Sequence, residues 1–214
     1  MSFDGEVLVL AERIWSGLVE RGWAAVREVS EVGVYEGLTG VAPEAGMGAL
    51  WSVLGGVDVG GLPIDSEATA GARCASMAEQ AEALGVGEPF DELDGSAEGD
   101  VRLVWWDRGW VPLFMSADDA FAVDGHPGAG GRAGQVIYCD LDYGCGREAL
   151  WPSLVDFLND MLAVVSSDGF VVEGDSGIGW LADDAGQDQW MLRILLDVGF
   201  ARRDGRPVPY PALR

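Results

Sequence analysis

Carboxylate pairs in the middle of the chain are the residues whose types and spacing could do chemistry. Asp118 and Asp119 are adjacent in a polar break between apolar runs, and Asp140 and Asp142 lie two residues apart near the end of another run. Side chains two residues apart in an extended strand share one face, so the second pair should point the same way. Such pairs can bind a divalent cation or transfer protons. In a chain with 36 acidic residues, they also arise by chance as part of a solvated surface.

Other motifs lack a part that their chemistry requires. The sequence GDSG at residues 174–177 resembles the nucleophile motif of trypsin-like proteases, but the only histidine, His126, precedes Pro127 and is interpreted as a turn residue. The sequence GAGGRA at residues 128–133 matches a dinucleotide-binding fingerprint, yet a strand-like run follows it where that fingerprint needs a helix. A phosphate-binding Walker loop needs a lysine, and the chain has none. We therefore predict no catalytic residue, no cofactor and no enzymatic activity.

The charge is the most unusual global property of the chain. Its 13 basic residues, all arginine, stand against 36 acidic residues, which gives a formal net charge of -23. This field repels nucleic acid and anionic membranes, and it accelerates association with a basic partner. The alternative is that the charge only keeps the protein dispersed in solution. A basic protein partner is the sharper hypothesis, with no binding of nucleic acid or membrane expected.

The cysteines, the first residues and the length of the chain limit the class of protein. The cysteines Cys74, Cys139 and Cys145 are odd in number and form no CxxC pair, which predicts reduced thiols and no metal site. The first residues are acidic where a signal peptide needs basic ones, and no run of about 18 apolar residues is present, so a cytoplasmic location is expected. The length of 214 residues fits a single domain over 1–214.

Short aromatic and β-branched runs separated by Asp and Gly predict an antiparallel meander. The expected strands are Val101–Trp106, Trp110–Met115, Ala120–Asp124 and Val136–Leu141. Because side chains alternate along a strand, Trp105 and Trp106 should face opposite sides, which would leave Trp105 available to a partner. Pro112 is expected on an edge strand, and Asp124 is expected to cap the turn that Gly134 makes.

Apolar spacings of three and four predict helices on both sides of this meander. The expected helices are Glu6–Trp23, a short one from Pro43 to Gly55, Asp65–Leu84 with Ser66 as a possible cap, Leu150–Val165 and Gln187–Val198. Residues 62–64 and 170–173 are expected to be extended, and residues 85–100 and 174–186 are expected to be loops. The fold class is therefore α+β, a mostly antiparallel sheet flanked by helices.

The central stretch resembles the SUKH superfamily. VRLVWWDRGWVPL, FAVDGHPGAGGRAGQVI and LWPSLVDFLNDML are similar to its pattern of W-x-P, V-D-x-x-P, G-x-x-G-Q-V-I and a helix of S-(L/F)-x-x-F-L character, and GVAPEAGMGALWSVLGG resembles its upstream helix. The resemblance covers about residues 26–166, which leaves an N-terminal helix over 1–25 and a C-terminal extension over 167–214. The motif residues, to which we assign a structural role, are Trp106, Trp110, Pro112, Asp124, Pro127, Gly131, Gly134 and Gln135.

The resemblance implies a function in protein binding. Many bacterial members of the superfamily are immunity proteins that neutralise polymorphic toxin domains, often nucleases or nucleotide-modifying enzymes, and fungal relatives regulate cell-wall assembly. We expect a bacterial immunity protein that binds a basic toxin domain in a stoichiometric complex. The expected partner contacts are Glu92, Asp94, Asp118, Asp119, Asp140, Asp142 and Trp105. The alternatives are a regulatory or scaffold protein of the cell-wall type, and a metal-assisted hydrolase that uses the paired aspartates.

Overall fold

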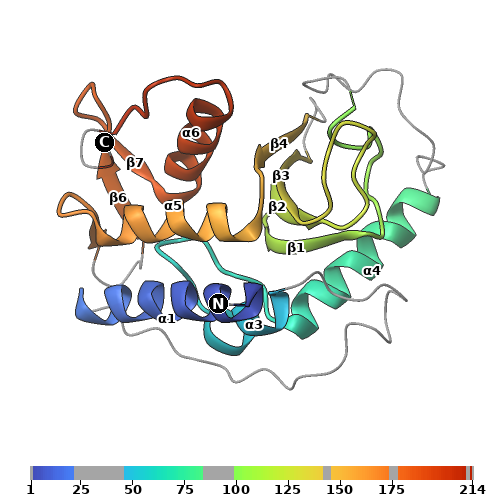
Figure 1. Cartoon of the computed structure of the whole chain (residues 1–214), viewed down its shortest axis with the longest axis horizontal. Helices are drawn as coiled ribbons and strands as arrows, with labels where there is room; N and C mark the ends of the chain where they lie inside the picture. Colours follow the sequence, from blue (N-terminus) through green and yellow to red (C-terminus); the bar gives the residue numbers. More distant parts are fainter. Residues whose placement is uncertain are drawn as a thin grey trace.

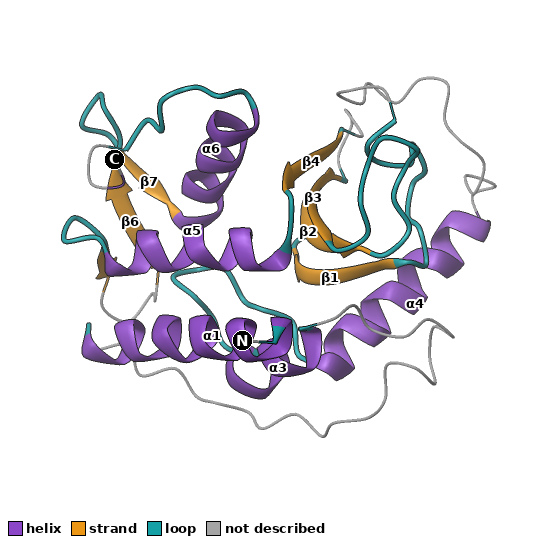
Figure 2. Ribbon diagram, viewed as in Figure 1, coloured by secondary structure: helices purple, strands orange, loops and turns teal. Residues whose placement is uncertain are grey.

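The chain folds as an α+β protein, as the sequence predicts (Figure 1). The structure, a computed structural model, describes residues 2–21, 46–83, 99–141, 146–173, 178–210 and 213. The helices are α1 (Phe3–Glu20), α3 (Met47–Leu54), α4 (Glu67–Ala83), α5 (Leu154–Ser166) and α6 (Met191–Arg203). Figure 2 shows α5 between α1 and the C-terminal part of the chain, with the larger sheet beyond the start of α5. No helix in the described ranges combines the length and the apolar character that crossing a membrane requires.

The larger sheet is an antiparallel meander in the order β1-β2-β3-β4. Its strands are β1 (Trp110–Met115), β2 (Asp119–Asp124), β3 (Gln135–Asp140) and β4 (Arg147–Trp151). Three of these strands agree with the prediction. Pro112 lies in the edge strand β1, and the register shifts between Pro112 and Phe114. This placement is the expected one, because proline cannot donate to a ladder of hydrogen bonds.

The predicted strand Val101–Trp106 is wrong, because this segment packs on a face of the sheet instead of extending its edge. Val101, Val104 and Trp106 are buried in one apolar cluster with Ile137 and other residues of the sheet. The segment makes its backbone hydrogen bonds locally, as from Val104 N to Arg102 O, and through side chains of the sheet. The fourth strand is instead β4, so the alternation argument for Trp105 and Trp106 does not apply.

Both faces of the larger sheet are therefore covered. Phe121, Val123 and Val136 point into the main core, which also contains buried residues of α1, α3, α5 and α6. Ala120, Ala122 and Ile137 point the other way, towards segment 99–109 and α4, which packs against β1. The strands carry apolar residues on both faces for this reason.

Helices α1, α4 and α5 begin where a serine can cap them. Ser2 Oγ accepts from Gly5 N at 3.2 Å at the start of α1, and Ser66 Oγ accepts from Thr69 N at the start of α4, as predicted. Helix α5 begins at Leu154, with Ser153 as its N-cap, rather than at Leu150, because Leu150 and Trp151 end β4. Helix α1 packs along α5 and α3.

A second sheet, β5-β6-β7, forms the C-terminal part with α6. Its strands are β5 (Val171–Glu173), β6 (Ile178–Ala182) and β7 (Asp188–Trp190). The loop predicted over residues 174–186 is therefore wrong at β6. A Cβ at Gly179 would lie 2.2 Å from the Phe170 ring, so a glycine lets β6 pass against that ring. Because β7 takes residues 188–190, α6 begins later than predicted.

Candidate functional site

The structure brings three of the predicted partner contacts together at one end of β2 and β3. We call Asp118, Asp119 and Asp140 the acidic rim. Asp119 opens β2 and lies directly opposite Asp140, the last residue of β3, while Asp118 O accepts from Leu141 N at 2.7 Å. Asp118 is exposed and the other two are half-buried. Like charges directly opposite one another on neighbouring strands are unfavourable, so the rim favours an approaching cation.

Tyr138 connects the acidic rim to the core. Its hydroxyl donates to Asp119 Oδ1, and its ring lies 6.0 Å from that of buried Phe121. Burial, the hydrogen bond to Asp119 and the charges of Asp119 and Asp140 all raise the pKa of Tyr138. The phenol therefore stays a hydrogen-bond donor at any physiological pH and holds the Asp119 carboxylate in place.

Arg147 connects Trp105 to the acidic rim. This arginine is fully buried, and the sequence reasoning missed it. Arg147 donates to the carbonyls of Trp105, Asp140 and Gly146, and its guanidinium lies 6.0 Å from the centroids of the Trp105 and Trp110 rings. Trp105 itself is half-buried. The predicted contacts Glu92, Asp94 and Asp142 lie outside the described residues, as does Cys145; Cys74 and Cys139 are buried free thiols.

The motif residues around Gln135 form a buried hydrogen-bond network. Gln135 Nε2 donates to Asp100 O at 2.8 Å and to Asp124 Oδ2 at 2.9 Å, and its Oε1 accepts from Arg132 N at 3.1 Å. Asp124 Oδ1 accepts from His126 N, and its carbonyl accepts from Gly134 N, so Asp124 closes the turn as predicted. Burial raises the pKa of Asp124, and the hydrogen bond from Gln135 opposes this shift.

The remaining motif residues pack around this network. Trp106 and Trp110 are buried and meet edge to face, with ring centroids 5.5 Å apart. Pro127 is half-buried directly after His126. A Cβ at Gly131 would lie 2.0 Å from Asp100 O, so this glycine permits two loops to touch. Gly134 has a φ of 85°, a conformation that favours glycine.

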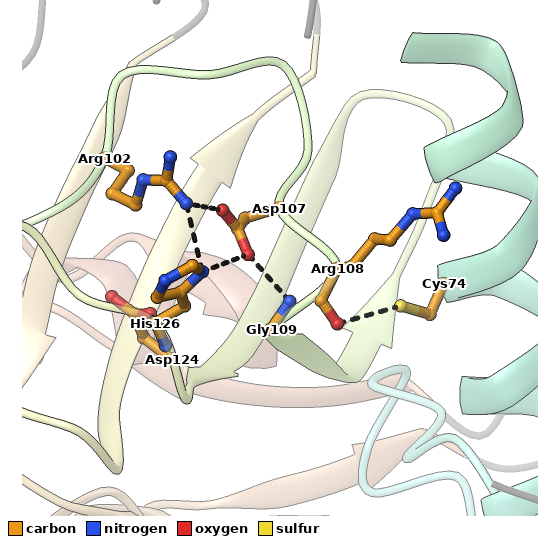
Figure 3. A network of polar contacts seen from close by, with 7 residues as sticks. All are labelled: Cys74, Arg102, Asp107, Arg108, Gly109, Asp124 and His126. Carbon is orange, nitrogen blue, oxygen red and sulfur yellow. Dashed lines mark hydrogen bonds and ion pairs between the residues drawn. The ribbon is translucent and has the colours of Figure 1, made fainter. Parts of the chain in front are cut away.

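His126 lies in a turn, as predicted, and also takes part in a polar network that the sequence did not indicate (Figure 3). Its Nδ1 lies 3.1 Å from Asp107 Oδ1, which also accepts from Gly109 N at 2.7 Å. Arg102 bonds the other oxygen of Asp107 and lies 3.0 Å from His126 Nδ1. A Cβ at Gly109 would meet His126 Cβ at 2.6 Å, so the glycine makes room for the imidazole.

An imidazole that a carboxylate orients can transfer protons, but the described residues that line the cleft beside His126 include no serine, threonine or cysteine. The closest thiol in Figure 3 is that of buried Cys74, which donates to Arg108 O at 3.7 Å. The side chain of His126 is 64% exposed, at a shallow cleft of about 410 Å³. In the described ranges, no group of three or more His, Cys, Asp or Glu residues could hold a metal ion.

Most arginines in the described ranges bind acceptors of this same chain. Arg21 donates to Ser167 O and Phe170 O, each at 2.7 Å, and Arg73 donates to Met115 O. Others pair with carboxylates, as Arg202 does with Asp160. The described arginines therefore serve largely to hold segments of this chain together, and exposed carboxylates such as Asp118 remain at the surface.

A scan against protein-family models found no match, and a search of curated proteins found none either.

Proposed function

We propose that this protein is a SUKH-like immunity protein that binds a basic toxin domain through its acidic surface. The observation that carries this proposal is the formal net charge of -23 in a chain whose described arginines mostly bind acceptors of the chain itself. Few of its cations are thus left to neutralise the surface carboxylates. A partner rich in Arg and Lys supplies the missing positive charge, whereas nucleic acid and anionic membrane are repelled.

The acidic rim is the proposed centre of the contact. An incoming arginine or lysine relieves the repulsion between Asp119 and Asp140, which face each other across two strands. An arginine can also form two parallel hydrogen bonds with one carboxylate, which adds geometric specificity. Tyr138 and Arg147 hold the rim from behind, so little ordering is needed when the partner binds.

The proposed mechanism is occlusion. A toxin that acts on nucleic acid or nucleotides needs basic side chains to bind its substrate, and the acidic surface covers those side chains in a stoichiometric complex. Association should then be fast at low salt and slow at high salt, because electrostatic steering is screened.

Affinity capture of the tagged protein from its host, at low and then high salt, tests this function. A single basic protein, retained in near-equal amount and released by salt, supports the proposal. With that partner in hand, we expect Asp118→Asn with Asp119→Asn to lower the association rate several-fold. The matched control, Glu12→Gln with Asp168→Asn, removes the same charge from exposed positions on α1 and after α5. An equal loss in both double variants would place the contact elsewhere.

Two other outcomes would replace this proposal. Capture of cell-wall or housekeeping assemblies would indicate the regulatory alternative. A hydrolytic activity that depends on an added divalent cation and is lost in Asp140→Asn would indicate the metal-assisted hydrolase.

A further inference from the structure

A second cleft has a chemistry opposite to that of the acidic rim. It lies between the Gly-rich segment 128–134, the end of β4 and the last turn of α6, and it has a volume of about 460 Å³. Helix α6 packs against β4, which sets one wall of the cleft. This volume falls within the range of small-molecule sites, roughly 300–1,000 Å³.

Three arginines from two separate parts of the chain line this cleft. Arg132 comes from the Gly-rich segment, and Arg202 and Arg203 come from the last turn of α6. This is a notable concentration in a chain that has 13 arginines, no lysine and 36 acidic residues. The net charge of the chain repels anions, whereas this cleft offers them several guanidinium groups.

Carboxylates of the same chain fix the arginines of α6, and the partner of Arg202 is buried. Arg202 Nε donates to Asp160 Oδ2 at 2.6 Å, and the same oxygen accepts from Trp151 Nε1 at 2.9 Å. Asp160 is 5% exposed, while the Arg202 side chain is 51% exposed and faces the cleft. Arg203 is held by Glu148 and Asp204. A guanidinium has more donors than these contacts use, so the exposed side of Arg202 can still bind a ligand.

Hydrogen bonds of Gln135 hold the backbone segment that carries Arg132. Gln135 Oε1 accepts from the backbone N of Arg132, while Gln135 Nε2 bonds Asp100 O and buried Asp124. Gly131 also packs closely against Asp100 O, so the same two segments touch on both sides of Arg132. The guanidinium of Arg132 forms no ion pair or hydrogen bond with any residue that the structure describes. The donors of the Arg132 guanidinium are therefore available to a ligand in the cleft.

We propose that this cleft binds a small molecule that carries a phosphate or carboxylate group, with Arg132 and Arg202 as the main anion contacts and Arg203 beside them. The planar fork of donors in a guanidinium matches both oxyanions. Asp100 and Asp156 also line the cleft and accept hydrogen bonds from hydroxyl or amino groups elsewhere on the ligand. Gln135 is a positioning residue, because it holds the backbone of Arg132.

The test measures binding of inorganic phosphate, pyrophosphate and succinate to the full chain, by calorimetry and thermal shift, at an ionic strength held constant with NaCl. Arg132→Gln is the test variant, and Arg13→Gln on α1 is its matched control, because Arg13 is also exposed and has no ion-pair partner among the described residues. We expect at least one anion to bind the wild type and Arg13→Gln, and to bind Arg132→Gln roughly tenfold more weakly.

The pattern among the probes identifies the ligand. Binding of phosphate or pyrophosphate alone indicates a phosphate ester, and binding of succinate alone indicates a carboxylate. The proposal is overturned if none of the anions binds better than chloride, or if Arg132→Gln binds them as well as Arg13→Gln does.

Discussion

Gln135 shows how much one side chain can hold together. Its amide bonds the backbone of two loops and the buried carboxylate of Asp124. Gln135→Ala should lower the free energy of unfolding by about 2–3 kcal/mol, because it leaves buried polar groups without partners. Urea unfolding followed by tryptophan fluorescence measures this change. Gln80→Ala is the control, since among the described residues Gln80 bonds Ser76 alone, on the exposed side of α4, and it should change stability by less than about 0.5 kcal/mol.

Asp65 makes stability depend on pH. It is 4% exposed, and burial raises its pKa to about 7 from 3.8, while the charge of Arg73 opposes this shift. The folded state therefore keeps this proton up to about pH 7, whereas the unfolded chain loses it near pH 4. The contribution of Asp65 to the free energy of unfolding is therefore fully present below about pH 4, and it is lost as the pH rises towards 7.

Asp65→Asn should flatten that part of the pH profile. Between about pH 4 and 7, the stability of the wild type relative to this variant should fall as the pH rises. Denaturant unfolding at a series of pH values measures the difference, and Asp168→Asn, at an exposed position, should leave the slope of the wild type unchanged. Parallel profiles for wild type and Asp65→Asn would show that Arg73 keeps the carboxylate ionised.

Sequence patterns predict residue roles only where the partners are near in the chain. The turn that Asp124 closes was predictable, because Gly134 and Gln135 follow it within one hairpin. The contact of Arg147 with Trp105 joins residues 42 positions apart, and that of His126 with Asp107 joins residues 19 positions apart. Arg147 stands between Gly146 and Glu148, and this local sequence gives no sign that it will be buried. These contacts depend on the tertiary fold.

The same limit applies to secondary-structure elements. Short aromatic and β-branched runs between turn residues predict β1, β2 and β3, since each of these strands pairs with a neighbour in sequence. The run Val101–Trp106 has the same composition, but a local pattern cannot tell whether an apolar run pairs with an edge strand or packs on a face of the sheet. Strand β6 was missed because Gly179, which looks like a loop residue, is required by the Phe170 ring.

Gly131 tests the contact between the Gly-rich segment and residues 99–100. A Cβ at this position would lie 2.0 Å from Asp100 O, so Gly131→Ala must push two backbones apart and should cost about 2 kcal/mol or more. Gly48→Ala is the control, because nothing lies within 4 Å of its Cβ and it sits in α3, where alanine should stabilise by about 0.5–1 kcal/mol. Thermal or urea unfolding of both variants gives the comparison. Equal stability of Gly131→Ala and wild type would contradict the packed contact.

Charge is the property that acts on the whole molecule. A formal net charge of -23 makes the folded state repel itself, and salt screens that repulsion. Raising the ionic strength from about 10 mM to about 150 mM shortens the screening length from roughly 30 Å to roughly 8 Å. The melting temperature of the free protein should then rise by a few degrees. A triple variant with Glu12→Gln, Asp118→Asn and Asp168→Asn has less repulsion to screen, so its rise should be smaller.

The proposed complex should respond to salt in the opposite direction. Its association rate depends on attraction between the acidic surface and a basic partner, so the same increase in ionic strength should slow association. One salt series, read by thermal unfolding of the free protein and by stopped-flow mixing with the partner, separates the two effects. If salt lowered the melting temperature of the free protein, its internal arginine pairs would outweigh the repulsion between carboxylates. The salt dependence of association would then be the only part of this series that tests the acidic surface.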